Sequence, residues 1–260
     1  SEGAQCRWHD GIRVAPSTAY VDPAGLHIRP FTNWVQAATN LQAAIDQACG
    51  GTTVRVAAAS YPLNAQVEVA KGILLAGAGT NASFLYRGGV PVMRVLWISA
   101  SNAVVEGFAI TNGNVTASDF YTGAGVIQFD GTLRNCLVAR NKADSNGSGG
   151  GIHLLGGTVS NCIIRNCSGW MQGNGVLMDG GVLRESTLIA NGGGRSDMSG
   201  GGIHLNGANF CTIASNLVDD NDTGIWLGFQ APVDDGGDDN TVAFNTIIGS
   251  PAVGIRISPA

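Results

Sequence analysis

Two histidines occupy matching places in nearly identical segments of the chain. Residues 149–157 read GGGIHLLGG and residues 200–208 read GGGIHLNGA, so His153 and His204 share most of their neighbours. Imidazole acts as a general base or a metal ligand when a second functional group lies within bonding reach. The repetition therefore has two interpretations: a pair of catalytic histidines, or one rung of a repeated scaffold.

Similar glycine–apolar starts recur along the chain, which favours the scaffold. Successive starts are separated by 26, 24, 27, 22 and 30 residues, and turn asparagines by 29, 25, 25, 25 and 29 residues. The starts lie at Gly125, Gly151, Gly175, Gly202, Gly224 and Gly254, and the asparagines are Asn112, Asn141, Asn166, Asn191, Asn216 and Asn245. Short apolar strands and glycine-rich turns at one such period predict coils of a parallel β-helix, stacked about 4.8 Å apart. We expect the six asparagines to form one column.

The alternation of side chains within each start predicts a second, outward column. In GIHL, Ile152 and Leu154 point inward and His153 points outward. His153 and His204 are two coils apart, about 10 Å, which is too far to share a metal or a proton. We expect an exposed stripe that stacks on a sugar or packs against a partner, or else a plain solvated face. Its members are His153, Leu177, His204, Trp226 and Arg256.

The segment before the coils predicts a cap. TNLQAAIDQACGG combines a capping box formed by Thr39 and Gln42 with an apolar helix face and a stop at Gly50. Such a helix can cover the open end of the core. The predicted organisation is a tail over 1–19, a cap over 20–51 and an all-β parallel β-helix over 52–260.

A family resemblance agrees with this organisation. Residues 20–63, YVDPAGLHIRPFTNWVQAATNLQAAIDQACGGTTVRVAAASYPL, resemble the start of secreted bacterial right-handed β-helix proteins of the pectin-lyase-like superfamily. The GGGI starts also resemble repeats of polymorphic outer-membrane proteins, although the phenylalanine of their F-x-x-N motif is mostly missing. The resemblance covers roughly Tyr20 to Ala260. It implies the right-handed fold and an extracellular or cell-surface setting, and it leaves activity open because the superfamily includes lyases, epimerases, adhesins and tail spikes.

The composition excludes several classes of partner. A net charge of −5 with only two lysines argues against binding to nucleic acid, which needs clustered basic residues. No apolar run approaches the roughly 20 residues of a transmembrane helix.

An enzyme is the second hypothesis. Uronate lyases and epimerases need a cation or cationic side chain that polarises the carboxylate, and a base near the C5 proton. Arg134 and Arg184 lie two coils apart with Ser160 between them, but no matching acidic column stands beside them. A polysaccharide lyase or epimerase therefore lacks a recognisable site.

Two acidic loops could hold a hard cation. VDDNDTG at 218–224 and VDDGGDDN at 233–240 offer the clustered carboxylates that Ca²⁺ prefers, although solvated acidic turns have the same composition. The candidate ligands are Asp219, Asp220, Asp222, Asp234, Asp235, Asp238 and Asp239.

The cysteines and sequons suggest an oxidising compartment. A bond between Cys6 and Cys49 would tie the tail to the cap, whereas Cys136, Cys162 and Cys211 fit a ladder of small core residues with Ser186 on one rung. Sequence does not fix the pairing. Candidate glycosylation sites are Asn81, Asn114, Asn146, Asn166 and Asn221.

The incomplete last coil suggests assembly. GIRISPA supplies a single strand, and an uncovered strand is a template for another chain. We expect the tail over residues 1–19 of one copy to dock there on the next, which would give a head-to-tail filament. The leading hypothesis is thus a secreted or cell-surface structural protein with an adhesive or glycan-contacting face. A carbohydrate-active enzyme is the runner-up, and a phage or host-recognition fibre is a third possibility.

Overall fold

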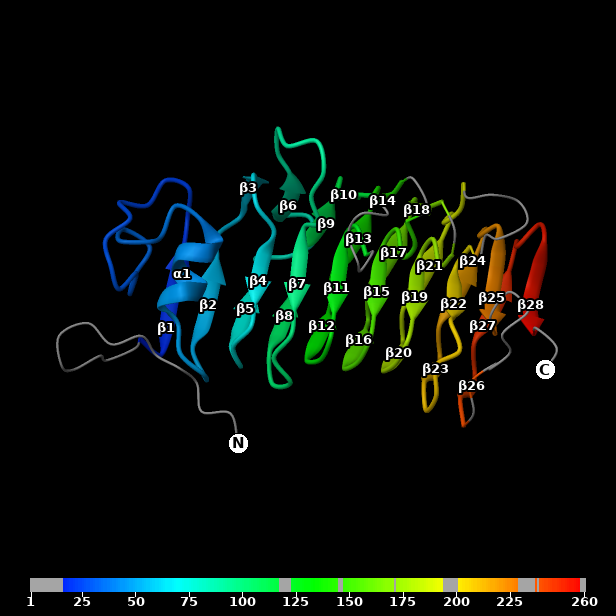
Figure 1. Cartoon of the computed structure of the whole chain (residues 1–260). Helices are drawn as coiled ribbons and strands as arrows, with labels where there is room; N and C mark the ends of the chain where they lie inside the picture. The colour runs from blue at the N-terminus through cyan, green and yellow to red at the C-terminus, as the bar shows by residue number, and fades with distance from the viewer. Residues whose placement is uncertain are drawn as a thin grey trace.

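The computed structural model describes residues 16–116, 123–144, 147–170, 172–193, 201–228, 237 and 239–257. It is a parallel β-solenoid in which short strands stack side by side from β1 at one end to β28 at the other (Figure 1). One short helix, α1 (Leu41–Gln47), lies at the N-terminal end. The predicted parallel β-helix is confirmed. No helix within these ranges is long and apolar enough to cross a membrane.

Three long sheets form the walls of the solenoid. Sheet A runs through β1 (Thr18–Val21), β2 (Thr53–Val56), β5 (Leu74–Ala76), β8 (Val104–Glu106), β12 (Thr132–Arg134), β16 (Thr158–Ser160), β20 (Val182–Arg184), β23 (Thr212–Ala214) and β26 (Thr241–Ala243). Sheet B runs through β3 (Ala59–Leu63), β6 (Ser83–Arg87), β9 (Ala109–Thr111), β13 (Leu137–Ala139), β17 (Ile163–Arg165), β21 (Thr187–Ile189), β24 (Leu217–Asp219) and β27 (Thr246–Ile248).

Sheet C closes each coil and contains all six glycine–apolar starts. It runs through β4 (Val67–Val69), β7 (Leu96–Ile98), β11 (Val126–Gln128), β15 (Ile152–Leu154), β19 (Val176–Met178), β22 (Ile203–Leu205), β25 (Thr223–Leu227) and β28 (Val253–Ile257). A small sheet D joins β10 (Asn114–Val115), β14 (Lys142–Ala143) and β18 (Ser168–Gly169). The β-structure begins at Thr18, two residues before the predicted start of the cap.

The core is a set of apolar columns, because every coil repeats its strands in register with the coil before. In sheet A, Leu133 pairs with Val159 and Val159 with Leu183, and all three side chains are buried. One face of a three-residue strand cannot bury itself. The hydrophobic contribution to stability therefore comes from apolar residues stacked on like residues of neighbouring coils.

Close contact between backbones explains the glycines that start sheet C strands. A Cβ on Gly151 would lie 2.4 Å from the carbonyl oxygen of Gly175, and a Cβ on Gly175 would lie 2.5 Å from that of Gly202. These distances are far inside van der Waals contact. The first five starts are therefore points where consecutive coils approach too closely for any side chain, whereas Gly254 in the last coil has no such contact.

The asparagines belong to two different turns of the coil, so the single asparagine column that we predicted is wrong. The AB turn joins sheets A and B, and the BC turn follows sheet B. Asn216 and Asn245 are inner residues of the AB turn, whereas Asn141 and Asn191 are inner residues of the BC turn. Asn112 and Asn166 instead occupy the left-handed position of the BC turn, with φ of 61° and 53°. The inner positions of the two turns are five residues apart in each coil, so asparagines of different turns recur at similar spacings in the sequence and resemble one column.

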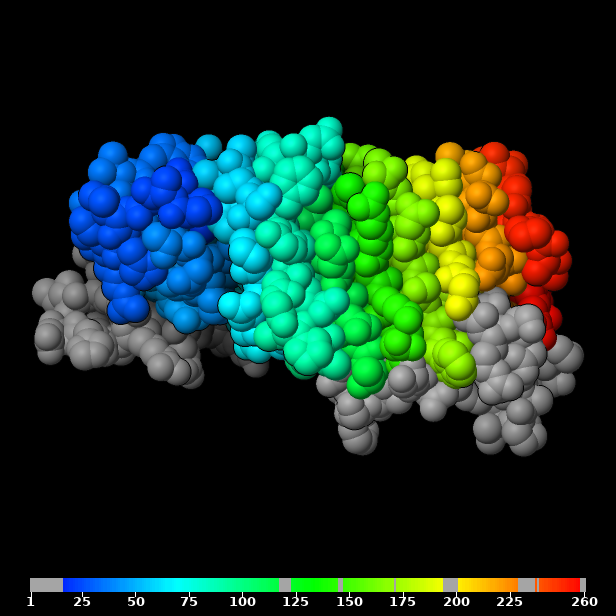
Figure 2. Space-filling model, turned by 90° about the horizontal axis from the view of Figure 1, so that it is seen from above, coloured from blue at the N-terminus to red at the C-terminus, as the bar shows by residue number. Residues whose placement is uncertain are grey.

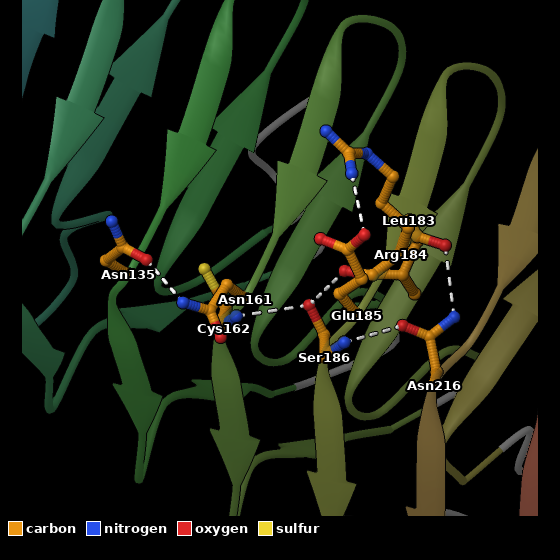
Figure 3. Close-up of polar contacts among 8 residues, drawn as sticks. All are labelled: Asn135, Asn161, Cys162, Leu183, Arg184, Glu185, Ser186 and Asn216. Carbon is orange, nitrogen blue, oxygen red and sulfur yellow. Dashed lines mark hydrogen bonds and ion pairs between the residues drawn. The ribbon is translucent and has the colours of Figure 1, made fainter.

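The inner residues of the AB turn form a ladder of hydrogen bonds between coils (Figure 3). The backbone N–H of Cys162 donates to Oγ of Ser186 at 3.1 Å, and that of Ser186 donates to Oδ1 of Asn216 at 3.0 Å. Asn216, and not Cys211, therefore occupies the rung after Ser186. Cys211 directly precedes β23, one coil beyond Gly181.

The cap helix α1 closes the N-terminal end, as predicted, but its N-cap differs from the prediction. Asn40 is the N-cap, and its side chain accepts from the backbone N–H of Ala43 at 2.9 Å. The Thr39 backbone instead donates to Nδ1 of His27. Gln42 bonds to both the backbone N–H and the carbonyl oxygen of Glu68, so it occupies the free edge of β4.

Candidate functional site

The predicted outward column of sheet C exists. His153, Leu177 and His204 lie opposite one another on β15, β19 and β22, and Trp226 and Arg256 continue the series on β25 and β28. The sequence therefore identified the right residues and the right order.

The column is not an exposed stripe, and that part of the prediction is wrong. His153 is 5% exposed and His204 is 0% exposed, and Leu177 and Trp226 are also buried. Of the five, only Arg256 is exposed. At His153 and Leu177, the physical reason is that the turn before the strand folds back over this face. A Cβ on Gly149 would lie 3.3 Å from Cβ of His153. A polysaccharide cannot stack on these side chains while those turns are in place.

Two polar clusters lie in this covered column. Nε2 of His153 lies 2.7 Å from Oδ2 of Asp179, and Nδ2 of Asn206 donates to Oδ1 of the same carboxylate at 3.2 Å. Burial raises the pKa of Asp179, but the hydrogen bond to His153 and its charge act in the opposite direction. The net pKa of Asp179 is below the ordinary value. A histidine hydrogen-bonded to a carboxylate is the arrangement of a general base and its orienting group, but the His153 ring itself is buried.

The second cluster is a stack of three side chains. The rings of His204 and Trp226 lie 4.4 Å apart and only 6° from parallel, and the guanidinium of Arg256 lies 4.5 Å from the centre of the Trp226 ring. Burial lowers the pKa of His204 to about 4, so this histidine is neutral at pH 7. Its Nε2 lies 2.8 Å from the carbonyl oxygen of Gly228, which can only accept, so Nε2 carries the proton. The stack stabilises the last coils.

The described residues form no lyase-like centre around Arg134. Arg134, Ser160 and Arg184 are in register, as predicted. Sequence reasoning missed an acidic neighbour, because Glu106 is one coil earlier and its Oε2 lies 2.7 Å from Nε of Arg134. That pairing neutralises the cation that would have to polarise a uronate.

The predicted cation site falls partly outside the described residues. Asp234, Asp235 and Asp238 lie there. Among the residues that the structure does describe, no three of the metal-binding types gather. Asp220 and Asp222 line an open depression of about 480 Å³ beside the BC turns, and Oδ2 of Asp222 accepts from the backbone N–H of Gly193. Asp219 and Asp239 complete the predicted set, and Ca²⁺ binding stays a prediction.

The sequons differ in accessibility. Asn81 and Asn166 are exposed, and Asn146 lies outside the described residues. Asn114 already donates through Nδ2 to the carbonyl oxygen of Pro91. Asn221 is fully buried, and its Nδ2 donates to the carbonyl oxygen of Leu188, so its predicted glycosylation is wrong for the folded chain.

The cysteines divide much as expected. Cys136, Cys162, Cys167 and Cys211 are buried free thiols. Burial raises the pKa of Cys167 to about 11, so this thiol stays protonated and unreactive. Cys49 is disulfide-bonded, and its predicted partner Cys6 lies outside the described residues.

A groove beside the cap was missed by sequence reasoning. This cap groove has a volume of about 350 Å³ and lies where β1, β2 and β5 end. Its walls include Asp22, Trp34 and Arg55, and its floor includes Ala76 and Gly77. Trp34 was the available signal, because a tryptophan in a polar loop is rarely left without a partner.

The chain finds no match among models of protein families, curated proteins or solved structures. The fold alone thus defines the class of protein, an all-β parallel solenoid with one capped end.

Proposed function

We propose that the chain is a structural β-solenoid that associates with further copies of itself through its last coil. The observation that supports this proposal is the exposure of two residues that occupy one column of sheet C on successive coils. Ile225 of β25 and Ile255 of β28 lie opposite each other, yet Ile225 is 0% exposed and Ile255 is 48% exposed. Both residues are isoleucine on paired strands, so the difference is whether another coil covers them.

The neighbouring residues of β28 share this property. Val253 and Ile257 alternate with the outward-facing Arg256 in the same way as Ile255, and both are exposed. Figures 1 and 2 place the last coil, drawn in red, at one end of the molecule. Among the described residues, β26, β27 and β28 are the last strands of sheets A, B and C, and exposed apolar side chains beside such edges support pairing with a further β-structure.

The two ends of the solenoid are not equivalent, which bears on the geometry of association. At the N-terminal end α1 packs on β1, β2 and β4, and Gln42 already bonds to the edge of β4. Lys71 completes this cap by donating to the carbonyl oxygens of Ile45, Asp46 and Ala48. These contacts support a two-fold pair in which two last coils face each other, a closed contact.

A head-to-tail filament is the second arrangement of the same surface. In it, residues 1–15 of the next copy would add a strand beside β28, which is the assembly that the sequence suggests. Those residues lie outside the described part of the chain. The pair and the filament differ in size: the pair stops at two copies, whereas the filament grows with concentration.

Secretion to an oxidising, extracellular or cell-surface setting is part of the proposal. The disulfide on Cys49 supports it, since such bonds persist in oxidising compartments. So does the resemblance to the pectin-lyase-like superfamily. Adhesion to a glycan needs a surface other than the covered sheet C column, and the cap groove is an open one.

The test of association is light scattering coupled to size-exclusion chromatography over a concentration series. We expect association of the wild-type chain and its loss in Ile255→Lys. Ile163→Lys is the matched control, because Ile163 is 47% exposed but lies on β17 in the middle of the solenoid. Deleting residues 1–15 should leave a two-fold pair intact and abolish a filament. A monomer at every concentration, or equal effects of the two lysines, would refute the proposal.

A further inference from the structure

We infer that the cap groove binds a neutral pyranose sugar, with the sugar ring lying against Trp34 and its hydroxyls between Arg55 and Asp22. The inference rests on the proposed glycan contact and not on the association through the last coil. A failure here therefore leaves the association test unaffected.

The groove exists because one rung of a charged column has almost no side chain. On the outer face of sheet A, Arg55 pairs with Ala76, and Ala76 pairs with Glu106. Consecutive rungs are about 4.8 Å apart, so Arg55 and Glu106 are separated by about 10 Å with only a methyl group between them. Gly77 extends the low floor. A space of this width along the column is left open by the small side chain of Ala76.

Trp34 supplies an apolar wall in a fixed orientation. Tyr20 of β1 contacts the indole, with ring centres 4.6 Å apart and an angle of 68° between their planes. The opposite side of the contact is not closed, because Trp34 remains 46% exposed. An indole held by a second ring loses little conformational entropy on binding, and its flat apolar surface suits the C–H face of a pyranose.

Arg55 and Asp22 supply donors and an acceptor on the rim. Arg55 makes no ion pair or side-chain hydrogen bond with the described residues, and Glu106, two rungs away, is paired with Arg134. Asp22 uses Oδ1 to accept from the backbone N–H of Ala24, which leaves Oδ2 to accept from a ligand.

This combination selects the ligand by chemistry. The guanidinium and the carboxylate cancel in charge, so an acidic sugar would gain at Arg55 and lose at Asp22. Sugar hydroxyls both donate and accept, and they can satisfy the two groups together. A carboxylate-bearing peptide or aromatic acid would satisfy Arg55 and Trp34 but would be repelled by Asp22. A neutral polyol with one apolar face is the class that uses all three walls.

The experiment follows the indole N–H signals of ¹⁵N-labelled protein during titration with cellotriose, maltotriose and mannotriose, with trigalacturonate as the acidic comparison. Trp34→Ala identifies the Trp34 signal. We expect at least one neutral trisaccharide to shift this signal in a saturable manner. Its dissociation constant should rise at least about tenfold in Arg55→Ala, because a hydrogen bond to a charged group is lost.

Ala76→Leu tests the groove itself without changing any charge. Leucine should fill the space beside Arg55 and abolish the shift, whereas Ala214→Leu should leave binding unchanged. Ala214 occupies the same outward column of sheet A but lies on β23, far from the cap. No shift with any neutral trisaccharide, tighter binding of trigalacturonate, or equal loss in both leucine variants would overturn the inference.

Discussion

Replacing Asn191 by alanine tests whether the two turns of a coil are distinct. The side chain of Asn191 is buried and joins three coils. Its Oδ1 accepts from the backbone N–H of Cys167, and its Nδ2 donates to the carbonyl oxygen of Ile164 and to Oδ1 of Asn221, all at 3.0 Å. Alanine leaves the Cys167 N–H and the Ile164 carbonyl without this partner. At about 1–3 kcal/mol for each buried group left unsatisfied, the free energy of unfolding should fall by about 2–6 kcal/mol.

The matched control is Asn166→Gly in the preceding BC turn. Asn166 is exposed and has a φ of 53°, a left-handed conformation that glycine adopts freely. We expect its free energy of unfolding to change by less than about 0.5 kcal/mol. Urea titrations followed by tryptophan fluorescence give both values, and amide hydrogen exchange at Cys167 should accelerate in Asn191→Ala alone. Equal destabilisation by the two substitutions would mean that the asparagines share one column and that the two-turn description is incorrect.

Two further outcomes follow from the same structure. The folded-state pKa of His204 is about 4, below the ordinary 6.5, so between these values the unfolded chain binds more protons and stability falls as the pH is lowered from 6.5 to 4. This loss should be about 3 kcal/mol smaller in His204→Gln when urea midpoints are compared at the two pH values; identical pH profiles would contradict it. Gly175→Ala places a Cβ 2.5 Å from the Gly202 carbonyl oxygen and should cost about 1–3 kcal/mol, whereas Gly89→Ala, with nothing within 4 Å, should be neutral in thermal unfolding. Similar melting temperatures for both alanines would refute the close contact between coils.

The coil and its core were predictable because their cause is local in sequence. Apolar residues such as Ile152 and Val176 recur at matching places because their side chains pack against each other in adjacent coils. Glycine recurs at positions such as Gly151 because the backbones of adjacent coils are in close contact there. The turns were harder. A coil of 30 residues between Ser186 and Asn216 contains two turns five residues apart, so the distance from Asn191 to Asn216 imitates a period of 25. Spacing alone cannot distinguish a true repeat of one turn from the distance between two different turns.

Exposure and partner choice were not predictable, because they depend on residues distant in the chain. Alternation correctly placed His153 on the outer face, but only the fold shows that the preceding turns cover it. Asn40 is the N-cap because Thr39 contacts His27, twelve residues earlier. The cap groove needs Trp34 and Ala76 together, and no pattern in either segment reports on the other.

The in-register stacking also means that the length of this molecule is an adjustable quantity. Because the strands of each coil pair with those of the adjacent coils, a duplicated coil such as β16–β19 could be inserted between existing coils with the same pairing partners on both sides. Each insertion would lengthen the rod by about 4.8 Å while leaving α1 and β28 chemically unaltered. A set of such rulers would separate, in steps of about half a nanometre, whatever binds at the two ends.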